Sequence, residues 1–206
     1  MNLLAKVCGL VRSDDVRLAA ALGADLLGFV RHPPSPRHCA DLSVATPFLD
    51  RAVLVMVAEQ GEEILDQVLR HGFRRVQPYF PQEHREAGVR LLRGAGLSVL
   101  LPWADEPGQE PIPADLYLWE PSAANTGVAG GSGLTHAMAF PPPGEFLLAG
   151  GLDASNLAQR IAALPAAARS RCRGVDAASR LEAGPGRKDP AKVAAFIQSA
   201  HALELP

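Results

Sequence analysis

The chain has 206 residues, of which 48% are hydrophobic and 20% charged, with a formal net charge of −2 at pH 7. This length is enough for a sizeable core, and we expect residues 1–206 to form one domain. The charge balance gives no reason to expect nucleic acid or an anionic membrane as a partner. Cys8, Cys39 and Cys172 form no CxxC motif. Their spacing argues against a disulfide framework, and the chain lacks a long apolar run or a leader pattern, so we predict a cytoplasmic protein.

Short apolar runs alternate with amphipathic stretches along most of the chain. The apolar runs are "LLAKVCG", "DLLGFV", "AVLVMVA", "RRVQPYF", "LSVLLPW", "DLYLWE", "EFLLAGG" and "CRGVDAAS". This alternation is typical of βαβ units and a parallel sheet. Eight units of roughly 26 residues predict a closed (β/α)8 barrel, although the chain is short for one. An open, doubly wound sheet is the alternative, and it would more often carry a glycine-rich fingerprint after the first strand.

Helix-start signals agree with this division. Ser13 is expected to cap the first helix, Asp153 or Ser155 the seventh, and Asp189 the last. One unit differs, because residues 104–115, "ADEPGQEPIPAD", are too rich in proline and glycine for a helix. We therefore predict a loop in place of the fifth helix.

The end of the first strand carries a thiol. Side chains alternate along a strand, so Lys6 and Cys8 share a face, and Cys8 would point into the mouth of a barrel. Active sites of such barrels lie at that end. From the residues alone, Cys8 is a nucleophile, a base or a small core residue.

Glycines follow the last two predicted strands. Gly150 and Gly151 precede one predicted helix start, and Ser179, Gly184 and Gly186 precede another. Glycines allow the backbone to approach a ligand, and helix N-termini offer free N–H groups to an anion. The two loops are either a phosphate cradle or ordinary tight turns.

Two other loops carry residues of interest for binding. Arg37 in "HPPSPRHCA" could hold a carboxylate or phosphate, or it is an ordinary surface arginine. The neighbouring His32, His38 and Cys39 lack a second cluster, so we expect no metal site. Residues 125–133, "NTGVAGGSG", form a glycine-rich loop without the GK[ST] of a Walker motif.

Several of these motifs together resemble phosphoribosylanthranilate isomerase, a family of tryptophan biosynthesis. The resemblance runs from Lys6 to Phe196 and is carried by "KVCGLVRSDDVRLAAALGADLLGFV", "SPRH", "VQ", "GGSG", "LAGGLDASN" and "GVDAASRLEAGPGRKDPAKVAAF". It implies a single-domain (β/α)8 barrel whose fifth helix is replaced by a loop. It also implies that no cofactor and no metal is used.

The resemblance implies an Amadori rearrangement, in which an aldose is converted to a ketose within one phosphosugar molecule. The small-molecule substrate would be N-(5′-phosphoribosyl)anthranilate, and the protein would be a monomer or a homodimer. Cys8 would be the general base, and the general acid would be Glu120, which stands where the family has an aspartate. The substrate-binding residues would be Arg37, Gln77 and Asp176, and the phosphate-binding residues Gly150, Gly151 and Ser179.

Lys6 offers a physical reason for a basic thiol. Its ammonium would lie roughly 7 Å from Cys8 and favour the thiolate, with Asp176 as the partner of the buried lysine. We therefore expect a lowered pKa for Cys8. We expect a raised pKa for Glu120, because an acid must hold its proton near neutrality.

The sequence departs from the family pattern in places. Pro78 and Tyr79 stand where the family has leucine and histidine, and Ala178 and Arg180 stand where it has serine and glycine. Two other functions therefore stay open. One is a relative that binds the substrate without turning it over, and the other is a phosphosugar isomerase for a different aglycone.

Overall fold

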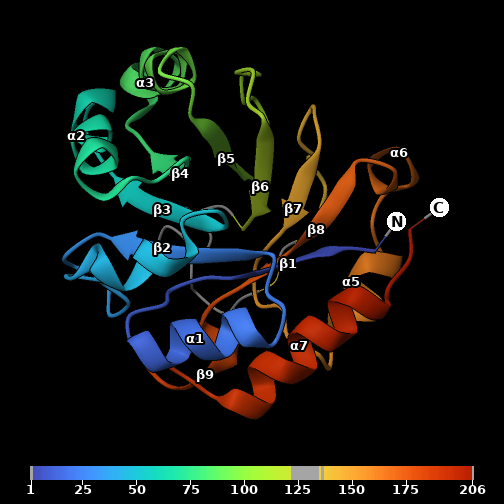
Figure 1. The fold of residues 1–206 in the computed structure, drawn as a ribbon. Helices are drawn as coiled ribbons and strands as arrows, with labels where there is room; N and C mark the ends of the chain where they lie inside the picture. Colours follow the sequence, from blue (N-terminus) through green and yellow to red (C-terminus); the bar gives the residue numbers. More distant parts are fainter. Residues whose placement is uncertain (1, 122–134, 136, 206) are drawn as a thin grey trace.

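The computed structural model describes residues 2–121, 135 and 137–205. Eight parallel strands form a closed barrel in chain order, and β1 pairs with β8 to close it (Figure 1). The strands are β1 Leu4–Val7, β2 Leu26–Arg31, β3 Ala52–Val57, β4 Arg75–Tyr79, β5 Ser98–Ala104, β6 Leu116–Glu120, β7 Phe146–Leu148 and β8 Cys172–Ala177. Each coincides with one of the eight predicted apolar runs, and β2 and β5 extend one residue beyond theirs, so the predicted barrel is confirmed.

Helices cover the outside of the barrel. They are α1 Ser13–Ala21, α2 Gly61–His71, α3 Gln82–Gly94, α5 Leu157–Ala162, α6 Ala166–Arg169 and α7 Pro190–Ala202. In Figure 1, α1 lies beside α7 and α2 beside α3, and both pairs are in contact. A 3-10 helix, η1 Leu42–Phe48, stands between β2 and β3. None of the described helices has the length and apolar character needed to cross a membrane.

The fifth unit has a loop where a helix would stand. Residues 105–115 between β5 and β6 contain no helix, which confirms the prediction from their proline and glycine content. The predicted loop at residues 125–133 lies outside the described residues.

The helix-cap predictions had mixed outcomes. Asp189 caps α7, since its carboxylate accepts hydrogen bonds from two backbone N–H groups of the first turn. The prediction for Ser13 was wrong, because α1 begins at Ser13 itself and the N-cap is Arg12, which makes no side-chain cap bond.

The predicted cap of the seventh helix was also wrong. The first helix after β7 is α5, which begins at Leu157 after the N-cap Asn156. Asp153 accepts hydrogen bonds from the N–H and hydroxyl of Ser155, so both polar side chains are used in the turn before the helix.

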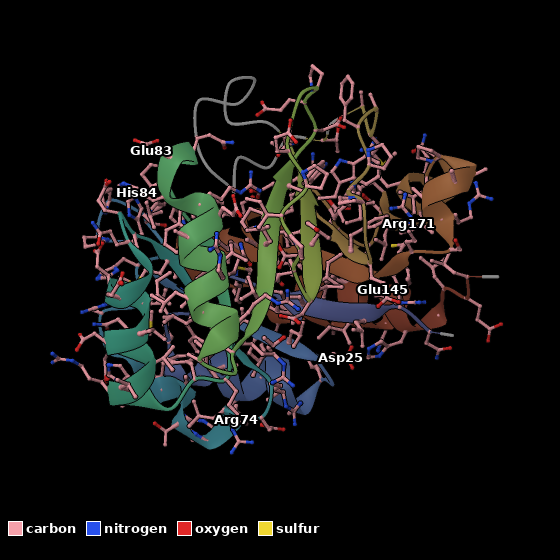
Figure 2. All side chains as sticks on the ribbon, turned by 90° about the horizontal axis from the view of Figure 1, so that it is seen from above. Asp25, Arg74, Glu83, His84, Glu145 and Arg171 are labelled. Atoms are coloured by element: carbon pink, nitrogen blue, oxygen red, sulfur yellow. The ribbon has the colours of Figure 1, made fainter. Side chains whose placement is uncertain are left out.

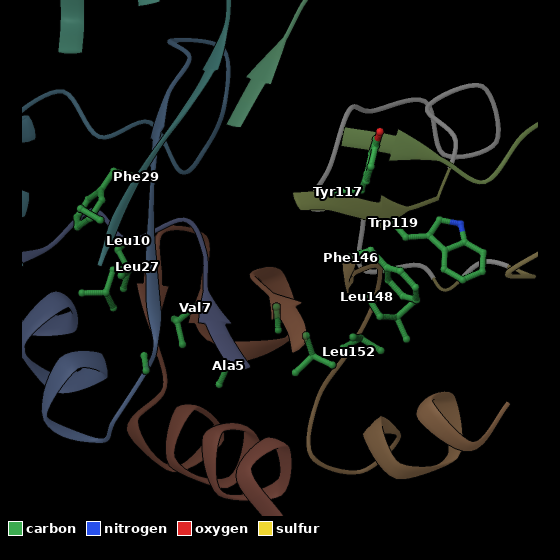
Figure 3. Close-up of a cluster of buried hydrophobic side chains, with 14 of the residues drawn as sticks. Ala5, Val7, Leu10, Leu27, Phe29, Tyr117, Trp119, Phe146, Leu148 and Leu152 are labelled. Atoms are coloured by element: carbon green, nitrogen blue, oxygen red, sulfur yellow. The ribbon is translucent and has the colours of Figure 1, made fainter. Parts of the chain in front are cut away.

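The core has an outer and an inner part. Alternate strand residues such as Val7, Phe29, Trp119 and Phe146 point outward and are fully buried between the barrel and its surroundings (Figure 3). The residues between them, including Cys8, Gln77, Leu118 and Glu120, face the interior. Strand alternation thus directs a set of polar side chains into the barrel.

The two ends of the barrel differ in what they carry. In Figure 2, Glu83 and His84 at the start of α3 mark the end where the strands finish, and Arg74 before β4 marks the other end. A short hairpin of β9 Glu182–Gly184 and β10 Arg187–Lys188 follows η2 Ser179–Leu181 after β8. The hairpin was not predicted, and it brings Glu182 and Lys188 to the site described next.

Candidate active site

A cavity opens at the carboxyl ends of the strands. Its volume is about 90 Å³. We call it the central cavity, and its lining residues are Cys8, Val30, His32, Ser35, Arg37, Val55, Val57, Gln77, Tyr79, Leu118, Glu120, Asp176 and Ala178. The structure thus brings five predicted site residues together: Cys8, Arg37, Gln77, Glu120 and Asp176.

A buried ion pair forms one side of the cavity. The register of β1 against β8 sets Lys6 opposite Asp176, and Lys6 Nζ lies 2.6 Å from Asp176 Oδ1. Lys6 is fully buried. Burial alone would lower the pKa of Lys6, but the charges of Asp176 and Cys8 raise it, so the ammonium stays charged. The pairing of Lys6 with Asp176 is as expected.

Burial controls the thiol of Cys8. Its side chain is nearly enclosed, and this desolvation raises the pKa of Cys8 above its usual value. Lys6 and Lys188 lower the pKa, and Asp176 raises it, but burial is the largest effect. The expectation that Lys6 brings the pKa of Cys8 below that of a free thiol was therefore wrong.

Two glycines allow a close approach of cavity side chains, Gly28 to the thiol of Cys8 and Gly9 to Arg37. A Cβ on Gly28 in β2 would lie 2.7 Å from Cys8 Sγ, which is too close for any side chain. Gly9 has a φ of 72°, and a Cβ there would lie 2.5 Å from Arg37 Cδ. Sequence reasoning did not assign either glycine a role, since both contacts join separate parts of the chain.

Glu120 ends β6 inside the cavity and is 8% exposed. Its desolvation raises the pKa of Glu120 to about 7, and the hydrogen bond from Tyr79 opposes this shift. Tyr79 Oη donates to Glu120 Oε2 over 3.2 Å. The expected raised pKa is thus found.

Gln77 on β4 joins the same group of side chains. Its Nε2 donates to Tyr79 Oη over 2.9 Å. Its Oε1 is buried and has no hydrogen-bond partner among the described residues. A buried oxygen of this kind is suited to a donor from a ligand, because leaving it unpaired is unfavourable.

Arg37 is held by a residue that the sequence did not indicate. Its Nε and Nη2 donate to the two carboxylate oxygens of Glu182 over 2.8 and 3.0 Å. Lys188 Nζ lies 3.2 Å from the same carboxylate. Glu182 thus orients the guanidinium at the edge of the cavity. The two residues are 145 positions apart, and no local pattern connects them.

The predicted phosphate loops follow the neighbouring strands β7 and β8. Gly150 and Gly151 have φ values of 92° and 58°, and Ser179 begins η2. The helix start does not directly follow the glycines, because a turn precedes α5. Arg180 Nη1 lies 3.0 Å from Asp153 Oδ2 and joins the two loops. The central cavity reaches this region at Ala178.

The site has no cluster of metal ligands among its described residues. Within the described ranges, no three His, Cys, Asp or Glu side chains gather in a way that could hold a metal ion. The three cysteines are free.

Titratable side chains therefore gather at the carboxyl ends of the strands of a (β/α)8-barrel protein. A family model described as N-(5′-phosphoribosyl)anthranilate (PRA) isomerase matches residues 113–199. A relative of that name from Azorhizobium caulinodans is 32% identical, over 99% of this chain and 94% of the relative. One from Pseudomonas paraeruginosa is 35% identical, over 94% of this chain and 93% of the relative.

A solved structure agrees with these relatives. The crystal structure of TrpF from Jonesia denitrificans has a TM-score of 0.77 and 30% identity, and the match covers 96% of each chain. The chain belongs to the N-(5′-phosphoribosyl)anthranilate isomerase family. The resemblance carried by the sequence motifs is confirmed.

Proposed function

We propose that the chain converts N-(5′-phosphoribosyl)anthranilate, an aminoaldose, to the corresponding 1-deoxyribulose 5-phosphate, an aminoketose. The observation that supports this most is that Cys8 and Glu120 line one cavity. The relatives that match the chain over nearly its full length are named N-(5′-phosphoribosyl)anthranilate isomerase. β1 and β6 are separated by β8 and β7 around the barrel. The two groups therefore come from different sides of the barrel and could act on neighbouring atoms of one sugar.

Glu120 is proposed as the general acid. Its carboxyl would give its proton to the ring oxygen of the ribose as the bond between that oxygen and C1′ breaks. The anthranilate nitrogen then shares its electron pair with C1′, which leaves an iminium ion. A pKa of about 7 suits this step, because the acid is protonated in part at neutral pH and still releases its proton.

Cys8 is proposed as the general base. The thiolate would take the proton from C2′, and the electrons of that bond would form the C1′–C2′ double bond and neutralise the iminium ion. A proton returns to C1′ as the 2′-hydroxyl becomes the carbonyl. Atoms and electrons are conserved within the substrate, so these steps use only proton transfers by side chains.

The raised pKa of Cys8 affects how this pair works. In the free protein the thiol is protonated at neutral pH, and Glu120 is partly ionised. The reactive form, thiolate with carboxylic acid, has the same net charge as the major form, thiol with carboxylate. Its fraction therefore stays constant between the two pKa values, and activity should fall below about pH 7 and above the pKa of Cys8.

The other lining residues suit the rest of the substrate. Arg37 would meet the anthranilate carboxylate with the guanidinium edge that faces away from Glu182. Apolar side chains from β2 and β3, including Val55 and Val57, could pack against the aromatic ring. Gln77 Oε1 could accept a hydrogen bond from a substrate hydroxyl or N–H group. Asp176 would act by holding Lys6 charged beside the thiol.

The phosphate is assigned to the loops after β7 and β8. Gly150 and Gly151 would let backbone N–H groups approach it, and Ser179 would offer its hydroxyl and N–H. The reducing cytoplasm is the proposed location, supported by the three free cysteines.

The test compares two substitutions of one residue. Turnover is followed by the change in anthranilate fluorescence or by separation of the ketose product. Glu120→Gln cannot donate the proton and should lower kcat by about 10² or more, with KM nearly unchanged. Glu120→Asp should keep measurable turnover, although its carboxyl is withdrawn by about 1 Å.

The exposed Glu110 supplies a matched control, and Glu110→Gln should turn over like the wild type. Turnover of Glu120→Gln at the wild-type rate would place the acid elsewhere. Saturable binding without turnover in the wild type would indicate a binding-only relative. Activity on a different aminoaldose alone would indicate another aglycone.

A further inference from the structure

Tyr79 stands between two of the residues assigned above, and it is one of the positions where this chain departs from its family pattern. Its hydroxyl accepts from Gln77 Nε2 over 2.9 Å and donates to Glu120 Oε2 over 3.2 Å. Gln77 and Tyr79 lie on the inner face of β4, and Glu120 ends β6. The three side chains form a hydrogen-bonded row across the cavity wall.

The direction of the hydrogen bonds is determined by the groups present. A tyrosine hydroxyl has one proton to donate. The Tyr79 oxygen accepts a hydrogen bond from the Gln77 amide, and the hydroxyl donates its proton to Glu120. Burial raises the pKa of Tyr79 well above its usual value, so the hydroxyl keeps its proton. With this direction Glu120 Oε2 is an acceptor, which leaves Oε1 to carry the proton of the neutral acid.

Other charged groups also face Glu120, and they act in opposing directions. Asp176 on β8 raises the pKa of Glu120, whereas Lys6 on β1 and Arg85 on α3 lower it. Lys6 is paired with Asp176, and Arg85 donates to the carbonyl of Pro102. Within the part of the chain that the structure describes, Tyr79 is the group that makes a hydrogen bond to the carboxyl of Glu120.

We propose that Tyr79 is a positioning residue that orients the acid Glu120, keeps the transferable proton on its Oε1, and stabilises its carboxylate after the proton has left. This inference rests on the proposed function. A structural role alone, in which Tyr79 only fills space, would leave the titration of Glu120 unchanged when the hydroxyl is removed.

The first measurement is made on the ligand-free protein and needs no activity. The side-chain carboxyl of Glu120 is titrated by carbon-13 NMR, and its signal is assigned by its loss in Glu120→Gln. The wild-type midpoint is expected at about pH 7. Tyr79→Phe keeps the ring and removes the hydroxyl, so the midpoint should rise by about one pH unit, the effect of one hydrogen bond to a charged group.

The second measurement is the pH profile of kcat/KM, which reports the ionisation of the free enzyme. The limb near pH 7 should move up by about one unit in Tyr79→Phe. At a fixed pH below the Glu120 midpoints of both the wild type and Tyr79→Phe, kcat of the variant should be lower than that of the wild type, while KM changes little. The reason is that the carboxyl loses its orientation and no substrate contact is lost.

Tyr117→Phe is the matched control. Tyr117 lies on β6, the strand that carries Glu120, but its hydroxyl donates to the carbonyl of Ile112 and its ring packs against Trp103. That variant should leave both the midpoint and the limb in place. The proposal is overturned if Tyr79→Phe also leaves them in place. A wild type without turnover would refute the proposed function instead, and the NMR midpoints would still test the hydrogen bond.

Discussion

At the position of Cys8, burial and charge act in opposite directions. The ammonium of Lys6 lies on the same inner face, as the strand alternation predicted, and lowers the pKa of the thiol. The desolvation of Cys8 has the larger effect, because the barrel and its neighbouring side chains exclude water from the sulfur. The same cause raises the pKa of Glu120, so the proposed base and acid are shifted in the same direction.

Removal of the thiol tests the role of Cys8. Cys8→Ala should lower kcat by about 10² or more, the usual contribution of a general base, and Cys8→Ser should be almost as poor because a hydroxyl is a weaker base. Turnover at saturating substrate is the measurement. Alanine is smaller than cysteine and serine is of similar size, so neither substitution crowds Gly28. The fold should therefore be kept, and circular dichroism would check this.

Cys172 is a suitable control for Cys8. It is also a buried free cysteine, but it begins β8 and lies at the opposite end of the strand from the cavity. Cys172→Ala should keep turnover within about twofold of the wild type, with a loss of stability typical of a small buried group. Equal turnover of the Cys8 and Cys172 variants would contradict the assignment of the base.

At the scale of elements, helix starts depended on contacts as well as on residue type. Asp189 and Ser13 are both good N-cap residues by type, yet only Asp189 accepts hydrogen bonds from the first turn of its helix. The difference is one of register, since α1 begins one residue before the sequence pattern indicated. The helix expected directly after Gly150 and Gly151 also begins at another residue than predicted. A turn around Asp153 comes first, and α5 begins at Leu157.

This contrast predicts a difference in stability. Asp189→Ala should lower the free energy of unfolding by about 1 kcal/mol, because two N–H groups at the start of α7 lose their partner. Ser13→Ala should change it by less than about 0.5 kcal/mol, as for most exposed positions. Urea denaturation of both variants at pH 7 measures this. A larger loss for Ser13→Ala than for Asp189→Ala would show that the cap assignment is wrong.

At the scale of the whole molecule, an acid kept neutral inside the barrel affects folding stability. The pKa of Glu120 is about 7 in the folded protein, against an ordinary value of 4.5. Below pH 4.5 the group is protonated in both states and has no effect. As the pH rises to 7 the unfolded chain ionises more readily, so the folded state loses stability, by roughly 3 kcal/mol once both states are ionised.

Glu120→Gln should therefore stabilise the protein at pH 8 and have little effect at pH 4.5. The measurement is the free energy of unfolding at the two pH values, and Glu110→Gln, at an exposed position, should show no such difference. An equal gain at both pH values would mean that packing, and not ionisation, explains the change. Together with the kinetic test, this separates the function of Glu120 from its effect on the fold.

The barrel could be predicted to a large extent because its signals are local. Each strand is a short apolar run, and the loop in place of the fifth helix follows from its prolines. Cys8 and Glu120 could be named because they stand in recognisable motifs at strand ends. The hairpin that carries Glu182 and the role of Tyr79 could not, because both depend on contacts between distant segments.

By itself, the sequence determined the order of the strands and the face on which each strand residue lies, since alternation is a property of the extended backbone. It also determined the family, through motifs spread along the chain. Only the tertiary structure decided which inward residues meet. Beyond the expected pair of Lys6 and Asp176, the hairpin after β8 brings Glu182 to Arg37 across 145 residues, and Tyr79 on β4 meets Glu120 on β6. The enclosure of the cavity raises the pKa of Cys8, although Lys6 acts to lower it. Desolvation depends on everything that surrounds a group, and no local pattern of residues contains that information.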